Sequence, residues 1–227
     1  MVSKLKHVFS PKMMTNHSLS NLAKGLNSVY NCVDRFEALE DKRGYDNGKQ
    51  FPAELYKRGV QKQLLDHWLS SEPRIYTVDG DGYNFDARRA GCEWAAFLRV
   101  RDPGATVLRV YPKSRTVDPE HTLCQLLSSL IYNFISLLPR EFDKVPDLCR
   151  RNFELLAQGG APGIDAGLRI LEALPPLELH GGRILCIVHG LNPAGSDGAA
   201  DNIRQVTAVL GRILARNDGH LLYTVTR

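Results

Sequence analysis

The run Ile184-Leu185-Cys186-Ile187-Val188 is the most apolar stretch of the chain. A continuous apolar run of this length predicts a parallel strand that is covered on both faces. Other β-rich runs, which are less uniformly apolar, occur at residues 75–78, 106–111 and 221–225. Because helical patterns separate these runs, we predict an α/β fold with a parallel, doubly wound sheet of about four strands and flanking helices.

The helices are predicted from three- and four-residue apolar spacing. Ser18 is expected to cap the first helix, which forms an amphipathic N-terminal arm within residues 1–52, and residues 1–17 are expected to be loosely attached. Residues 53–227 are expected to form the α/β domain, incomplete at its carboxyl end. The remaining helices are predicted at 53–70, 86–100, 119–138 and 199–216, with one or two more at 146–174, interrupted over 159–163.

Two details of these helices are specific enough to check. Asp118 and Pro119 predict the start of the 119–138 helix, since a capping aspartate followed by proline is typical of a first turn. One side of the 53–70 helix is expected to carry all its large apolar residues: Leu55, Val60, Leu64, Leu65, Trp68 and Leu69.

Composition excludes several classes of function. The net charge of +4 is mild, and Lys/Arg runs interleaved with aromatic residues are missing, so no nucleic-acid partner is expected. The five cysteines are dispersed without a Cys-x-x-Cys pair, which argues against zinc and disulfides and favours a reducing, cytoplasmic location. The segment Leu123–Leu138 is too short and too polar to span a bilayer, so no membrane partner is expected either.

The candidate site follows the strand at 75–78, because ligands of parallel sheets bind where strands end. A glycine-containing turn, Asp79-Gly80-Asp81-Gly82, leads there into a helix and could hold phosphate through backbone N–H groups. Counted from Gly80, the P-loop pattern would place its second glycine at Phe85, its lysine at Asp86 and its hydroxyl residue at Ala87. None of the three is retained, and an ordinary turn between strand and helix remains the simpler interpretation.

The end of the apolar strand is equally unusual. A P-loop NTPase carries acidic residues there that hold Mg²⁺ and activate water, whereas this chain has His189 and Asn192. The segment Val188-His189-Gly190 also resembles the oxyanion turn of α/β-hydrolases, which need a downstream nucleophile elbow and histidine. His220 follows, but Gly195-Ser196-Asp197-Gly198 is not such an elbow.

The order of the segments resembles fungal NACHT-type domains of the STAND class of P-loop NTPases over residues 55–227. Residues 64–78 resemble the helix and strand that enter the P-loop, and residues 123–138 the helix after the second strand. Residues 187–192 are similar to the Ile-Asp-Gly-Leu-Asp-Glu Walker B box, and 223–227 to the sensor strand. The resemblance implies a P-loop-NTPase-like fold in which the sensor strand lies between the P-loop and Walker B strands. Of the functional residues, only Arg227 matches.

We therefore expect a non-hydrolysing domain that acts through contacts with a protein, such as a full-length STAND protein, with no catalytic residue, metal or cofactor. The alternatives are an atypical ATP- or GTP-binding domain that uses Arg88, Arg89 and Arg227, and a hydrolase that uses His189. If a nucleotide binds with Mg²⁺, the candidate positions are Gly80, Gly82, Asp86, Ala87, Arg88, Arg89, His189, Asn192 and Arg227.

Overall fold

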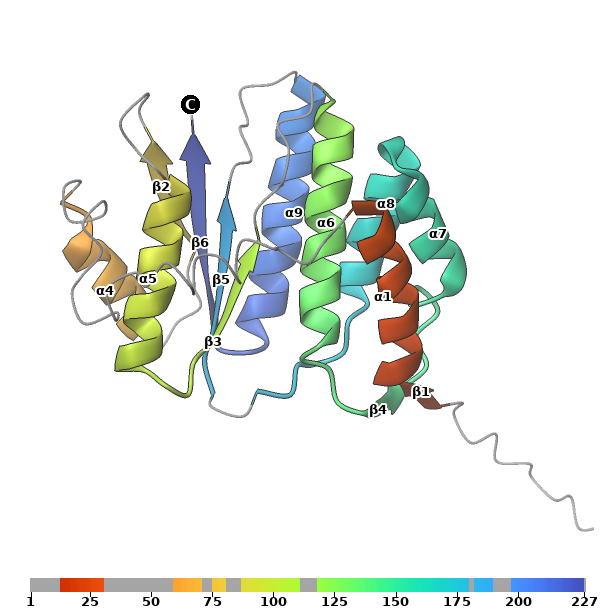
Figure 1. Cartoon of the computed structure of the whole chain (residues 1–227), viewed down its shortest axis with the longest axis horizontal. Coiled ribbons are helices and arrows are strands. Elements are labelled where there is room, and N and C mark those ends of the chain that lie inside the picture. Colours follow the sequence, from red (N-terminus) through yellow and green to blue (C-terminus); the bar gives the residue numbers. More distant parts are fainter. Residues whose placement is uncertain are drawn as a thin grey trace, which may run out of the picture.

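The centre of the protein is a four-stranded parallel sheet with strand order β2-β6-β5-β3 (Figure 1). The computed structural model describes residues 13–30, 59–70, 75–80, 87–110, 118–179, 182–189 and 197–226. The strands are β2 (Ile75–Gly80), β3 (Thr106–Val110), β5 (Ile184–His189) and β6 (Gly219–Thr226). The predicted α/β class and parallel sheet are confirmed.

Strand β5 explains why the sheet is covered on both faces. Leu185 and Ile187 pack in one core with helices α4 (Gln61–Leu69) and α5 (Ala87–Arg101). Ile184, Cys186 and Val188 belong to a second core on the opposite face. Each of these five side chains is at most 1% exposed. Because neighbouring side chains of a strand point to opposite faces, a strand that is apolar at every position requires this double cover.

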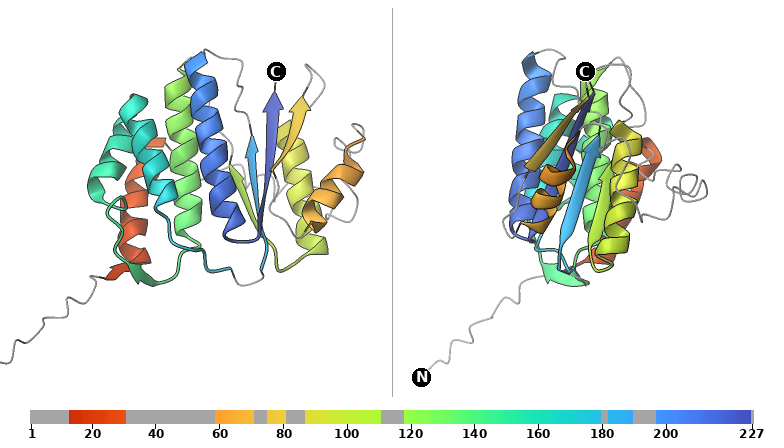
Figure 2. Two further views of the ribbon diagram at one scale, coloured as in Figure 1. Left: turned by 180° about the vertical axis from the view of Figure 1, so that it is seen from behind. Right: turned by 90° about the vertical axis from the view of Figure 1, so that its left-hand side faces the viewer.

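The second core contains most of the other helices: α1 (Asn16–Tyr30), α6 (Pro119–Ile135), α7 (Arg150–Gln158), α8 (Gly160–Glu172) and α9 (Asp197–Ala215). The right-hand view of Figure 2 shows α9 and α5 on opposite sides of the sheet. Residues 123–131 of α6 are all buried, because α1, α8 and β3 surround this helix. Within the described ranges, no helix has the length and apolarity that crossing a bilayer requires.

The N-terminal segment is more ordered than predicted. Strand β1 (Met13–Thr15) pairs antiparallel with β4 (Glu141–Asp143), so the expected loose attachment is wrong for residues 13–17. Helix α1 begins at Asn16, and the Thr15 hydroxyl accepts a 3.2 Å hydrogen bond from the Ser18 N–H. Thr15 therefore takes the capping position predicted for Ser18.

Helix α1 also packs firmly on the rest of the chain, against α6 and α7. At its end, the Tyr30 hydroxyl donates a 2.8 Å hydrogen bond to the Leu156 carbonyl of α7. The side-chain amide of Gln125 donates to the Tyr30 carbonyl over 3.2 Å. The continuation of this helix that the sequence suggests falls in residues 31–58, outside the described residues.

The start of α6 is as predicted, since the Asp118 carboxylate accepts a 2.9 Å hydrogen bond from the Glu120 N–H. The predicted interruption over 159–163 is wrong in extent. Only Gly159, with φ +81°, separates α7 from α8, and Gly160–Gly163 form the first turn of α8. Gly159 and Gly160 both have positive φ (+81° and +68°), which glycine adopts without strain, and together they end one helix and redirect the chain into the next.

The apolar face predicted for the 53–70 helix is corrected in one respect. Leu64 and Trp68 are buried, whereas Leu69 is 68% exposed and Leu65 is half-buried. Leu55 lies outside the described residues. Adjacent residues of a helix are about 100° apart, so a nine-residue helix with a narrow buried side cannot cover both members of each neighbouring pair.

Candidate functional site at the carboxyl edge of the sheet

All four strands run in the same direction, so their carboxyl ends meet at one edge of the sheet, at the top in Figure 1. The register fixes the neighbours at this edge. Gly80 of β2 lies beside Thr226 of β6, and His189 of β5 lies beside Thr224. Ligands of open parallel sheets bind at this edge, which makes it the candidate site.

Strand β6 lies between β2 and β5, so it separates the two sequence positions singled out for nucleotide chemistry. Gly80 and His189 are two strand spacings apart, about 10 Å across the sheet. This order agrees with the one that the NACHT resemblance implies, in which the sensor strand separates the P-loop and Walker B strands. Strands β2, β5 and β6, which contain parts of three of the segments that carry the resemblance, therefore end at this edge.

Helix α5 is the next described element after β2. Strand β2 extends through Gly80, two residues beyond the predicted end, and α5 begins at Ala87. Arg88 and Arg89 follow in the first turn of α5, which contains no acidic residue. Gly82 and Asp86 lie outside the described residues, as do Asn192 and Arg227.

The residues at this edge do not fit the Mg²⁺ ion of a hydrolysable nucleotide. Mg²⁺ prefers oxygen ligands in near-octahedral geometry, commonly a hydroxyl and a carboxylate in P-loop enzymes. Ala87 has a methyl group at the hydroxyl position, and β5 ends in the imidazole of His189. Within the described residues, no three His, Cys, Asp or Glu side chains are grouped to hold a metal.

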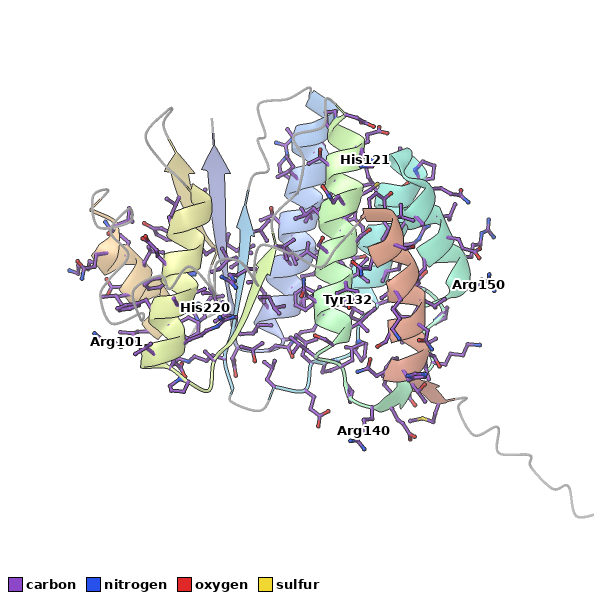
Figure 3. All side chains as sticks on the ribbon, viewed as in Figure 1. Arg101, His121, Tyr132, Arg140, Arg150 and His220 are labelled. Carbon is purple, nitrogen blue, oxygen red and sulfur yellow. The ribbon has the colours of Figure 1, made fainter. Side chains whose placement is uncertain are left out.

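The two histidines of the hydrolase alternative lie at opposite ends of the sheet. His220 pairs with Leu185, four residues before His189 on the same strand, which places them about 13 Å apart along the strand direction. Figure 3 shows His220 in the interior, away from the carboxyl edge. Its side chain is 2% exposed and therefore remote from any substrate. These two residues cannot share one active site.

His220 belongs instead to a buried aromatic cluster that sequence analysis missed. Its ring lies edge-on to that of His67 at 4.9 Å and 5.6 Å from Trp68, so the cluster joins α4 to β6. The Arg183 guanidinium lies 5.9 Å from the Trp68 ring and donates a 2.7 Å hydrogen bond to the Trp68 carbonyl. No local pattern signals this contact, because 153 residues (220 − 67) separate the two histidines.

The cysteine chemistry at the sheet agrees with the sequence interpretation. Cys186 is fully buried in β5, and this burial raises the pKa of its thiol to about 12. A thiol that stays protonated at neutral pH is a poor nucleophile and a poor metal ligand. Cys186 therefore acts as a small apolar core residue.

No protein-family model, curated protein or solved structure matches the chain. The NACHT resemblance therefore stays a prediction from the sequence segments quoted above.

Proposed function

We propose that this chain is a P-loop-NTPase-like domain of NACHT type that does not hydrolyse nucleotide and acts through contacts with another protein, such as a full-length STAND protein. The observation that carries the proposal is the position of β6 between β2 and β5. This is the strand order that the NACHT resemblance implies, and because the strands are parallel, Gly80 and the end of β5 lie at the same edge, where a P-loop NTPase has its nucleotide site.

Loss of hydrolysis follows from the chemistry at the two strand ends. Phosphoryl transfer depends on Mg²⁺ and on a group that positions the attacking water. Ala87 removes the metal-binding hydroxyl on one side of β6, and His189 replaces the metal-binding carboxylate on the other. Because both contributions are missing together, restoring either one alone is not expected to restore activity.

Titration calorimetry with Mg-ATP and Mg-GTP tests the absence of hydrolysis. Variants that restore the missing groups test whether the segment after β2 can act as a P-loop. The unmodified protein is expected to bind neither nucleotide. A variant with Phe85→Gly, Asp86→Lys, Ala87→Ser and His189→Asp regains the P-loop and Walker B groups, and we expect Mg-ATP to raise its melting temperature. The matched control has Asp86→Ala in place of Asp86→Lys and lacks the phosphate-binding cation.

Two results would contradict the proposal. Turnover of ATP or GTP by the unmodified protein would show that hydrolysis has been retained by other residues. A restored variant that folds but whose melting temperature does not change with Mg-ATP would show that the turn after β2 does not have P-loop geometry. The protein contact is tested separately. The chain is co-expressed with a NACHT-containing STAND protein, and size-exclusion chromatography of the purified sample shows whether the two proteins co-elute.

A second candidate function is nucleotide binding without hydrolysis, favoured by the two arginines in the first turn of α5. Anions bind well near helix N-termini, and Arg88 and Arg89 add positive charge there. If this function is present, ATP raises the melting temperature of the unmodified protein, and Arg88→Ala with Arg89→Ala abolishes the increase. Arg99→Ala with Arg101→Ala, in the last turn of the same helix, is the control with equal charge loss.

A further inference from the structure

Helix α4 lies at the margin of the fold, beyond α5, and carries an unusual outward face (Figure 1). We call this face the outer stripe; it consists of Lys62, Leu65, Asp66 and Leu69. These positions follow the i, i+3, i+4, i+7 spacing of a single helix face. Leu69, the last residue of the helix, is 68% exposed, which is high for a leucine.

The outer stripe is also hollowed. Its four side chains line a depression of about 700 Å³ together with Gly59 and Gln61, which precede or begin the helix. A side chain placed on Gly59 would meet nothing within 4 Å. The stripe therefore offers a projecting leucine at its carboxyl end and open space at its amino end.

The charges of the stripe complement each other between copies. Neither Lys62 nor Asp66 forms an ion pair with any residue that the structure describes. When two α4 helices pack antiparallel about a twofold axis near residue 64, Lys62 of each copy faces Asp66 of the other. The same register brings Leu69 of each copy over Gly59 of the other and the two Leu65 side chains near the axis. A twofold contact of this kind is self-complementary in shape and charge.

We propose that the outer stripe binds the outer stripe of a second copy of this chain, forming a symmetric antiparallel α4 dimer. The inference is independent of nucleotide chemistry, since α4 lies away from the carboxyl edge of the sheet. The helix has nine residues and is about 14 Å long, so the contact is small. An interface of this size forms a reversible dimer whose population rises with protein concentration.

Sedimentation equilibrium of the full chain tests the proposal through charge reversal. Lys62→Glu makes the stripe entirely acidic and Asp66→Lys makes it entirely basic, so each variant alone repels its own copy. We expect the dimer dissociation constant to rise at least ~10-fold in each, because two attractive pairs become two repulsive ones. Mixing the two variants restores both attractive pairs, and we expect a heterodimer about as strong as the original dimer.

Leu69→Glu removes the projecting side chain and is expected to abolish dimerisation. Lys144→Glu, at an exposed lysine outside α4, is the charge-matched control and leaves the dissociation constant unchanged. An unmodified protein that stays monomeric at all accessible concentrations would overturn the proposal. A dimer that tolerates both reversals, or a mixture of the two variants that stays monomeric, would also overturn it. Recovery of the heterodimer also shows that both variants are folded.

Discussion

Replacing Gly219 with alanine tests how tightly β6 is held at its start. An added Cβ would lie 2.6 Å from Cγ2 of Ile184, and 2.8 Å and 3.0 Å from Cδ2 and Cβ of Leu214. Cγ2 of Ile184 cannot move away without a change of χ1, because β-branched side chains are stiff at that bond. Overpacking a core typically costs about 1–3 kcal/mol, and this contact permits little relief, so we expect a loss of about 2–3 kcal/mol.

Thermal unfolding followed by circular dichroism measures this loss. For a chain of 227 residues it corresponds to a fall in Tm of about 4–12 °C. The matched control is Gly211→Ala in α9, whose new Cβ would lie an ordinary 3.4 Å from Cδ1 of Ile75. Alanine is favoured over glycine within a helix, so this variant should gain about 0.5–1 kcal/mol. A Gly219→Ala protein as stable as the unmodified one would refute the packing described for β5, β6 and α9.

Three further predictions concern stability. Asp118→Ala removes the cap of α6 and should lower the free energy of unfolding by about 1 kcal/mol in urea denaturation. Asp118→Asn should keep most of the stabilisation by the cap, because asparagine is also a good N-cap residue. Tyr30→Phe removes the hydrogen bond to the Leu156 carbonyl and should cost about 1 kcal/mol in the same assay, while Tyr132→Phe should cost almost nothing. Because burial raises the pKa of Cys186 from 9.0 to about 12, the free energy of unfolding should fall as pH rises above 9. At pH 10 this contribution is about 1 kcal/mol smaller than at pH 7, and the pH profile of the Cys186→Ala variant should lack this decrease.

The parts of the fold that were predicted correctly have a signal within one short segment. Residues 184–188 of β5 are all apolar, and the start of α6 has its own capping aspartate and proline. Each of these signals reflects burial or a local hydrogen bond, so neighbouring residues suffice to reveal it. The α/β class then follows from their alternation along the chain.

The parts that were missed depend on residues far apart in sequence. Strands β1 and β4 have only three residues each, too few for an alternating pattern to predict a strand, and they pair where α1 packs on α6. The neighbours of Gly80 and His189 at the carboxyl edge also depend on the position of β6, which no local pattern indicates and only the NACHT resemblance implied. The His67–His220 contact is of the same kind, since it exists only once α4 lies on the sheet.

The central place of β6 has a consequence for the order in which the protein folds. It follows every other described element in the sequence, yet it is the strand that joins β2 to the rest of the sheet. During synthesis, β2 has no described neighbour to pair with until β6 is made, 146 residues later, counting from Tyr76 to Leu222 (222 − 76). Pairings of such long range close slowly and leave strand edges exposed in the meantime. In nascent chains that stop before residue 219, the side of β5 that pairs with β6 therefore has no strand partner. A chaperone that covers unpaired strand edges should bind these chains in preference to the protein in which β6 is paired.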